Sequence, residues 1–363
     1  MKTPHIIAGP CSFESDNEMF KLAEQLSLLP NVKTFRAGIW KPRTLPGAFE
    51  GRGASALPAL EAIQNKYNLE AAVEVSLPEH VEACMKYNIK KLWIGARSVC
   101  SPDLLEALFK KISERNPAST LLIKNPYACD LQLWIGATLR AQKHGLQVEH
   151  CFRGVKTEKP LFRNAPLWSW VREIKKQFPQ TKMYLDPSHL YGKREVIMSE
   201  IKNFKRLDLF DAYMVETHLF PERALTDATQ QLTPQELARF IAALHESYDK
   251  DAVDLLTLRK HIDHIDQCIL EQFKLRQDIS KQVAHSKRRS GHPVYDKKRF
   301  DELLSTRTLM AKKVGLSLSF TKEIFTKIHD ESVSRQITEL LQTRNNQRTG
   351  KIENEKDSKI QRI

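Results

Sequence analysis

The sequence contains no long apolar run. No stretch approaches the roughly eighteen consecutive apolar residues that a membrane-spanning helix needs, and no apolar core of signal-peptide length follows Met1. The 6 cysteines show no Cys-x-x-Cys spacing, which argues against a disulfide framework in a chain of this length. These absences predict a cytoplasmic protein without a membrane partner.

A net charge of +13 raises the question of nucleic-acid binding. The excess of Lys and Arg lies mainly in the C-terminal third, where aromatic residues do not alternate with the basic ones. The stacking platforms typical of nucleic-acid binding are therefore missing from the pattern. We expect no nucleic-acid partner.

The first 220 residues alternate short β-rich runs with helical patterns. Such alternation predicts parallel strands joined by crossover helices. Eight runs fit a closed (β/α)₈ barrel better than the alternative, an open doubly wound sheet. The runs are HIIAGP, VKTFRAG, EAAVEV, KLWIGA, TLLIKN, VEHCFRG, KMYLDP and AYMVETH.

The β-rich runs stop before residue 250, and only helical periodicity follows. Apolar residues such as Ile262, Ile265 and Ile269 keep the 3–4 spacing of one helix face, which predicts a separate all-α domain. The last residues are almost free of apolar side chains and mix both charges, which is typical of disorder. The predicted division is a barrel over 1–247, a linker over 248–254, an all-α domain over 255–341 and a disordered tail over 342–363.

Four potential metal ligands follow predicted strands. Each alone is more often structural, because a buried Cys usually acts as a small apolar residue. Together, one thiolate, one imidazole and two carboxylates would suit a divalent transition metal such as Mn²⁺, Fe²⁺, Co²⁺ or Zn²⁺. The four are Cys11, His189, Glu216 and Asp227.

Four cations also stand at predicted strand ends. The carboxyl ends of barrel strands share one rim, so these charges would repel one another unless an anion joins them. Arg and Lys suit phosphate and carboxylate, which predicts a small polyanionic substrate. The alternative is that each cation pairs with an acidic neighbour on a solvated rim. The four are Arg36, Arg97, Lys124 and Arg153.

The motifs at these strand ends resemble a known enzyme family. "AGPCS", "FRAGIWKPRT", "IGARS", "IKNP", "FRG", "DPSH" and "VETH" resemble, in order and spacing, the metal-dependent synthases of 3-deoxy-D-arabino-heptulosonate 7-phosphate (DAHP). The resemblance implies condensation of phosphoenolpyruvate with erythrose 4-phosphate, the first step of the shikimate pathway. It implies that the four cations hold phosphoenolpyruvate and that the four ligands bind a metal, with Mn²⁺ as the first candidate.

The "KPRT" motif would then seat the second substrate. The resemblance implies that Lys41, Pro42, Arg43 and Thr44 bind erythrose 4-phosphate, and that Lys41 gives a proton to the new hydroxyl. The sister synthase of ketodeoxyoctonate phosphate is an alternative, although "KPRT" favours the four-carbon aldose. "LPGAFEG" departs from the family's usual continuation, so the aldose loop is expected to close differently.

The segments "LRKHIDHID", "FKLRQDIS", "SKRRSGHPVYDKKR" and "ESVSRQ" of the helical domain resemble the all-helical chorismate mutases. That reaction needs fixed positive charge around a dicarboxylate, not a nucleophile. The resemblance implies that arginines bind the carboxylates and that Lys287 and Gln336 act at the ether oxygen. Phe300 stands where the family usually has an acidic residue, so a non-catalytic sensor or dimerisation domain remains the alternative. The matching positions are Arg259, Arg276, Lys287, Asp296, Arg299, Ser332 and Gln336.

Arg259 cannot reach the ligand that Arg276 binds in the same chain. Seventeen residues along one helix span about 25 Å, so a second chain must supply Arg259, which predicts an intertwined homodimer. The first predicted strand begins at His5, which leaves no preceding segment to bind an inhibitor. We therefore expect the helical domain to sense prephenate as a feedback inhibitor of the barrel.

Overall fold

The computed structural model describes residues 4–41, 47–117, 119–158, 160, 162–246 and 255–360. The chain divides into two compact units, Met1–Ala252 and Val253–Ile363. This division falls inside the predicted linker 248–254. None of the helices in the described part of the chain is long and apolar enough to cross a membrane.

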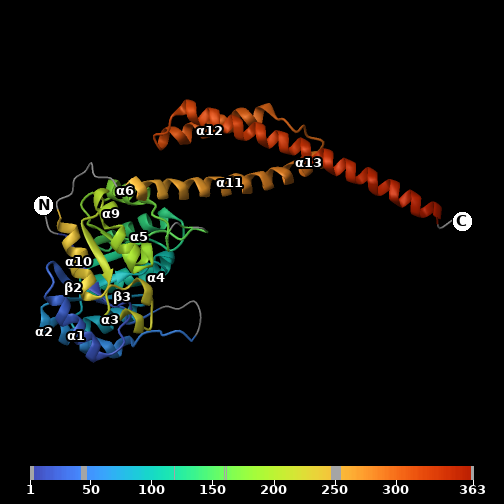
Figure 1. Cartoon of the computed structure of the whole chain (residues 1–363). Helices are drawn as coiled ribbons and strands as arrows, with labels where there is room; N and C mark the ends of the chain where they lie inside the picture. The colour runs from blue at the N-terminus through green and yellow to red at the C-terminus, as the bar shows by residue number, and fades with distance from the viewer. Residues whose placement is uncertain are drawn as a thin grey trace. The chain divides into compact units, whose positions relative to one another are not determined.

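The first unit is a closed barrel of eight parallel strands in sequence order (Figure 1). Pairing of β1 with β8, from His5 opposite Ala212 to Gly9 opposite Glu216, closes it. The predicted barrel is therefore confirmed and the open sheet is excluded. The strands are β1 (His5–Gly9), β2 (Val32–Ala37), β3 (Glu70–Val75), β4 (Lys91–Ile94), β5 (Thr120–Lys124), β6 (Gln147–Phe152), β7 (Met183–Leu185) and β8 (Ala212–Glu216).

Helices follow the strands as crossover connections. Several begin with a side-chain cap, such as Ser15 before α1 and the Thr233–Glu236 capping box before α10. The helices are α1 (Asp16–Ser27), α2 (Leu57–Tyr67), α3 (Pro78–Lys86), α4 (Pro102–Arg115), α5 (Leu131–Lys143), α6 (Trp168–Gln177), α7 (Pro187–Tyr191), α8 (Arg194–Ser199), α9 (Ile201–Arg206) and α10 (Pro234–His245).

Alternation along the strands builds two apolar clusters. In β1, Ile6 and Ala8 belong to the large cluster that the surrounding helices complete, whereas Ile7 belongs to a small cluster formed by strand residues alone. The same alternation places Leu122 of β5 in the small cluster. Because successive side chains point to opposite faces, the small cluster fills the barrel interior. It supports the charged residues that end the strands.

The second unit is helical. It consists of α11 (Leu255–Ser290), α12 (Lys297–Lys313) and α13 (Leu318–Ile360), and α13 packs against both of the others. The backbone of residues 342–360 is helical, where the sequence analysis expected disorder over 342–363. That stretch has no Pro and a single Gly, Gly350, so no residue forces the helix to end.

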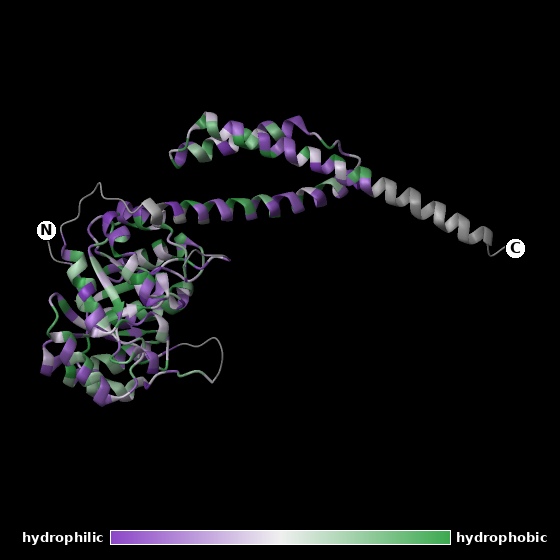
Figure 2. Cartoon of the chain, in the orientation of Figure 1, coloured by the Kyte–Doolittle hydropathy of each residue, from purple (hydrophilic) through white to green (hydrophobic). Residues whose placement is uncertain are grey.

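The helical unit leaves much apolar surface exposed. Apolar residues recur along α11 (Figure 2), and Ile262 and Ile265 are 57% and 56% exposed. Among the side chains described in this unit, only Ala284 and Ala311 are buried apolar residues. One copy of this unit therefore lacks the apolar core that three long helices normally enclose.

Gly9 is a position where the barrel tolerates no side chain. A Cβ on Gly9 would lie 2.1 Å from the carbonyl oxygen of Arg36, and the residue has a φ of +146°. We expect Gly9→Ala to lower the free energy of unfolding by about 2 kcal/mol or more. Urea titration followed by tryptophan fluorescence measures this in the barrel, because all 5 tryptophans lie in the first unit.

Gly136→Ala is the matched control. Gly136 lies inside α5, and a Cβ there would meet nothing within 4 Å. The same chemical change should raise stability by about 0.5–1 kcal/mol, since alanine favours the helix. Equal effects of the two substitutions would contradict the proposed close contact at Gly9.

Candidate active site

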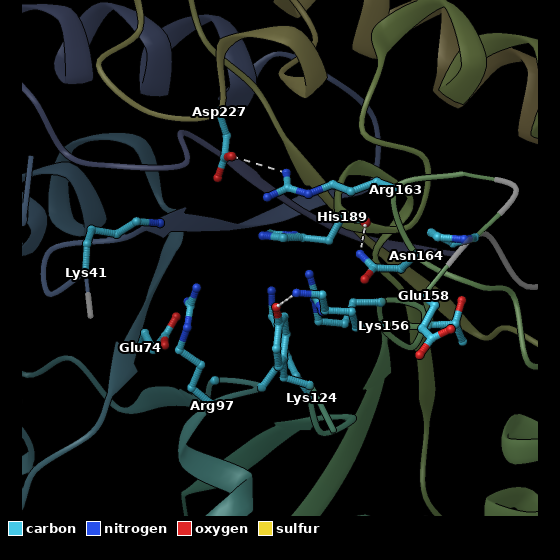
Figure 3. Close-up of a pocket in the computed structure, with 16 residues that line it drawn as sticks. Lys41, Glu74, Arg97, Lys124, Lys156, Glu158, Arg163, Asn164, His189 and Asp227 are labelled. Carbon is cyan, nitrogen blue, oxygen red and sulfur yellow. Dashed lines mark hydrogen bonds and ion pairs between the residues drawn. The ribbon is translucent and has the colours of Figure 1, made fainter. Parts of the chain in front are cut away.

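The carboxyl ends of the strands surround a cavity of about 460 Å³ (Figure 3). Charged side chains from loops after several strands line this cavity, as expected for a barrel whose strands all point the same way. Six of the predicted site residues are among them. These are Lys41, Arg97, Lys124, Arg153, His189 and Asp227.

The four predicted metal ligands come together beside the cavity. Sγ of Cys11 and carboxylate oxygens of Glu216 and Asp227 lie within 4.8 Å of one another. Nε2 of His189 lies 3.7 Å from Oε1 of Glu216. Cys11 follows β1, Glu216 ends β8, and His189 belongs to α7 after β7. Residues more than 200 positions apart thus form one cluster.

Burial sets the protonation of this cluster. It raises the pKa of the Cys11 thiol to about 12 and lowers the pKa of His189, which leaves the imidazole neutral. Burial also opposes ionisation of Asp227, but the nearby guanidinium of Arg163 favours the carboxylate, and the pKa of Asp227 is lowered to about 2. A neutral imidazole and an ionised carboxylate are ready metal ligands, and a bound dication would deprotonate the thiol.

The donor set fits a divalent transition metal. Oε1 of Glu216 is buried and accepts no hydrogen bond, although Arg36 lies 3.1 Å away. Sγ of Cys11 lies 3.2 Å from Oδ2 of Asp227. A thiol, two carboxylates and a neighbouring imidazole offer the mixed soft and hard atoms that such metals accept.

Asp186 holds the His189 ring in place. Its Oδ2 lies 2.7 Å from Nδ1 of His189 and 2.7 Å from Nζ of Lys124, and its Oδ1 accepts the His189 backbone N–H. A carboxylate on Nδ1 fixes the tautomer that leaves Nε2 free to ligate. Asp186 therefore joins the cation of one strand end to the imidazole of another.

Two buried guanidinium groups keep unused donors. Arg36 is 1% exposed, lies over the Trp93 ring at 5.1 Å, and its Nε and Nη1 have no hydrogen-bond partner. Nη1 of Arg153, which is 7% exposed, likewise has none. Buried donors are normally satisfied, so these unpaired groups indicate an anionic ligand.

Lys41 lies between the cavity and the thiol. Its Nζ donates to the carbonyl oxygen and to Sγ of Cys11, both at 3.0 Å. Burial opposes its charge, but neighbouring acidic groups, the Glu216 carboxylate among them, outweigh burial and raise its pKa, so Lys41 remains an ammonium. The predicted neighbours Pro42, Arg43 and Thr44 lie outside the described residues.

The cavity has further polar walls that the sequence analysis did not identify. They are Glu74, Tyr127, Lys156, Arg163 and Asn164. Glu74 lies inside β3, and the other four lie beyond the first residues after β5 and β6, where strand-end reasoning stops. A wider window after β5 and β6 would have found those four.

A second group of acidic and imidazole side chains does not suit a metal. Oxygens of Glu14 and Glu18 lie within 4.8 Å of a ring nitrogen of His218. Nδ1 of His218 accepts the backbone N–H of Phe220 at 3.1 Å. The neutral ring then carries its proton on Nε2, which faces Glu14 at 3.9 Å as a donor.

The helical unit brings several predicted mutase residues together. Nη1 of Arg276 donates to Oγ of Ser332 and to the Ile328 carbonyl oxygen. Nε2 of Gln336 donates to Oγ of Ser280 at 3.1 Å, while its Oε1 is buried without a partner. The contacts of these residues therefore link α11 to α13.

Other predicted residues make separate contacts. Lys287 donates to the Val294 carbonyl oxygen, and Asp296 caps α12 through the Arg299 backbone N–H. Arg259 is exposed on α11, one continuous helix that also carries Arg276, which agrees with the distance argument against a shared ligand. Phe300 packs against His329, with ring centroids 4.4 Å apart.

Comparisons with known proteins agree with the two-unit division. Residues 2–252 match the model of the DAHP synthetase I family, and residues 258–337 match that of chorismate mutase type II. A phospho-2-dehydro-3-deoxyheptonate aldolase of Thermotoga maritima is 30% identical over 228 residues, which cover 62% of this chain. The match spans 64% of that relative's length, less than two thirds.

Solved structures from Thermotoga maritima share the barrel. The crystal structure of its phospho-2-dehydro-3-deoxyheptonate aldolase (DAHP synthase) gives a TM-score of 0.58 at 26% identity, covering 66% of this chain and 67% of the other. A truncated form of its 3-deoxy-D-arabino-heptulosonate 7-phosphate synthase gives 0.55 at 24% identity, covering 66% and 84%. The second likeness supports the fold alone.

The unused donor of Arg153 predicts anion binding. Arg153→Gln removes a buried charge-assisted donor, and such bonds contribute about 1.5–3 kcal/mol. We expect the affinity for inorganic phosphate, measured by calorimetry on the full chain, to fall about tenfold to a hundredfold. Arg172→Gln, which removes an exposed arginine on α6, is the control and should leave it unchanged. Unchanged binding by Arg153→Gln would place the anion elsewhere.

Proposed function

This chain belongs to the DAHP synthetase I family, and on that basis we propose that its barrel condenses phosphoenolpyruvate with erythrose 4-phosphate to DAHP. The observation that carries the proposal is the junction of two features at one rim. Four side chains that could ligate a metal lie there beside buried guanidinium groups with unpaired donors. A metal-assisted reaction of a small polyanion needs both features.

Cys11, His189, Glu216 and Asp227 would hold a divalent metal, with Mn²⁺ first and Co²⁺, Fe²⁺ or Zn²⁺ as alternatives. When bound, the metal supplies Lewis-acid polarisation of the aldehyde. Asp186 keeps Nε2 of His189 free for this role through its contact with Nδ1.

Arg36, Arg97, Lys124 and Arg153 would hold phosphoenolpyruvate. The free Nε and Nη1 of Arg36 and the free Nη1 of Arg153 would satisfy phosphate or carboxylate oxygens. Burial strengthens these charge-assisted bonds because water does not compete for the donors. The bound anion would in turn reduce the repulsion among the four cations.

Lys41 would act on the other substrate as proton donor to the hydroxyl that forms from the aldehyde. Its raised pKa keeps the proton available, and its position against Cys11 places it beside the ligand cluster. Pro42, Arg43 and Thr44 would seat the phosphate of erythrose 4-phosphate. The names of the similar proteins favour this aldose over that of the ketodeoxyoctonate phosphate synthases.

We also propose that the helical unit converts chorismate to prephenate. Arg259, Arg276 and Arg299 would bind the carboxylates, and Lys287 and Gln336 would act at the ether oxygen. Rotation of the Gln336 amide would let Oγ of Ser280 donate to Oε1 and would turn Nε2–H toward the ligand. Asp296 and Ser332 complete the proposed site.

The proposed mutase is an intertwined homodimer. The exposed apolar stripe of α11 and the scarcity of buried apolar residues in the described helical unit favour a second copy as its cover. The second chain would also supply Arg259. Cytoplasmic location stays a prediction from the sequence.

We propose that prephenate bound in the helical unit slows condensation in the barrel. A ligand shifts an equilibrium only through its different affinities for two states. Inhibition should therefore saturate, and Arg276→Ala, which removes a proposed carboxylate ligand, should relieve it. A direct effect on the barrel would predict equal inhibition of that variant.

Metal removal tests the barrel proposal. Enzyme treated with chelator should lose condensation of phosphoenolpyruvate with erythrose 4-phosphate, and Mn²⁺ or Co²⁺ should restore it, because no described side chain replaces the Lewis acid. His189→Ala should abolish condensation but leave prephenate formation intact. Full turnover in excess chelator would contradict the metal assignment.

Mixed dimers test the mutase proposal. Arg276→Ala and Arg259→Ala should each lower prephenate formation by about a hundredfold or more, as removal of preorganised charge does. After subunit exchange, mixing the two variants should restore one complete site per heterodimer. Subunit exchange without recovery would count against Arg259 acting across the dimer, and an inactive wild type would favour the sensor alternative.

A further inference from the structure

Arg163 and Asn164, two neighbouring residues after β6, donate hydrogen bonds to the proposed metal-ligand residues. Nη1 of Arg163 donates to Oδ1 of Asp227 at 3.2 Å and also to Oε1 of Gln230. The side-chain amide of Asn164 donates to the backbone oxygen of His189 at 2.7 Å (Figure 3). Neither residue is itself one of the four ligands.

Gln230 extends the reach of Arg163 to a third ligand. Its Nε2 donates to Oε2 of Glu216 at 2.6 Å, and it is fully buried. The Arg163 guanidinium therefore orients Asp227 directly and Glu216 through one amide. The oxygens that these bonds leave free are Oδ2 of Asp227, which faces Sγ of Cys11, and Oε1 of Glu216.

The backbone around this pair is fixed. The Asn164 N–H donates to the Leu190 carbonyl oxygen at 3.1 Å, and Oγ1 of Thr229 donates to the Gly192 carbonyl oxygen at 3.0 Å. A Cβ on Gly192 would lie 2.7 Å from the Cβ of Arg163. The segment that follows His189 therefore approaches the Arg163 side chain closely at Gly192.

We infer that Arg163 and Asn164 are positioning residues that hold Asp227, Glu216 and His189 in the geometry a divalent metal requires. This inference rests on the proposed metal site and adds residues that act through the ligands. Residues that orient metal ligands typically change metal affinity about tenfold to a hundredfold when replaced.

A purely electrostatic role and a positioning role of Arg163 predict opposite changes in metal affinity when Arg163 is replaced. Its guanidinium repels a dication and occupies an oxygen of Asp227, so electrostatics alone predicts tighter metal binding after its removal. Loss of positioning predicts weaker binding, because Asp227 and Gln230 would lose their shared donor. The direction of the change therefore separates the two roles.

The experiment measures Mn²⁺ and Co²⁺ affinity of the metal-free full chain by competition with a chelator of known affinity. Arg163→Gln should weaken binding about tenfold to a hundredfold. Arg163→Lys, which keeps the charge and one donor group, should recover part of that loss. Asn164→Ala should weaken binding less, because it removes one bond to the His189 backbone.

Lys156→Gln is the matched control for charge. Lys156 lines the same cavity but donates to the Tyr127 hydroxyl and to no ligand side chain among the described residues. Its replacement should leave metal affinity unchanged or slightly tighter. The Co²⁺ absorption spectrum gives a second readout, since thiolate charge-transfer and ligand-field bands report Cys11 ligation and coordination geometry. These bands should change in Arg163→Gln and not in Lys156→Gln.

Unchanged or tighter binding by Arg163→Gln, with an unchanged Co²⁺ spectrum, would overturn the inference. If that variant does not fold, as shown by thermal unfolding, Arg163→Lys and Asn164→Ala decide by the same readouts. A wild-type chain that binds neither ion would overturn the metal proposal and this inference with it. A wild type that binds both, with variants that match it, would overturn the positioning role alone.

Discussion

The barrel site depends on buried charge that the fold pairs only in part. Arg36 and Glu216 lie 3.1 Å apart with side chains 2% and 0% exposed, and Lys124 and Asp186 lie 2.7 Å apart with side chains 5% and 0% exposed. Removing such ions from water costs several kcal/mol each, and pairing returns that cost only when every donor and acceptor is satisfied. A bound anion would accept hydrogen bonds from the donors of Arg36 that remain unpaired.

The positions of residues at the ends of predicted strands were enough to predict which of them meet at the rim, because the topology of the barrel, not the local sequence, brings them together. Cys11 and Asp227 are 216 positions apart, yet closure of β1 on β8 brings their side chains into contact. The same reasoning missed Arg163, which lies well past the end of β6. Its importance comes from a contact with Asp227 that neither residue's local sequence encodes. Long loops carry no periodicity from which such a contact could be predicted.

In the helical unit, the local sequence predicted the helix but not the contacts that its apolar face makes. The 3–4 spacing of Ile262, Ile265 and Ile269 predicted a helix, and α11 contains them. Periodicity indicates that one face of the helix packs against apolar residues, but it does not indicate whether those residues belong to the same chain. The absence of Pro likewise lets α13 extend through residues whose composition suggested disorder. The composition of a segment indicates how much apolar surface it can bury. Whether a helix continues through that segment depends on whether a residue such as Pro prevents the helical backbone conformation.

The two units therefore differ in what completes them. The barrel encloses its own core, and its four proposed metal ligands come from one chain. The proposed mutase site would take Arg259 from a second chain, and that chain would cover apolar surface that one chain leaves exposed. Chain association would then govern the mutase directly. Feedback through the helical unit would act only on associated chains, because a monomer would lack the site that senses the product.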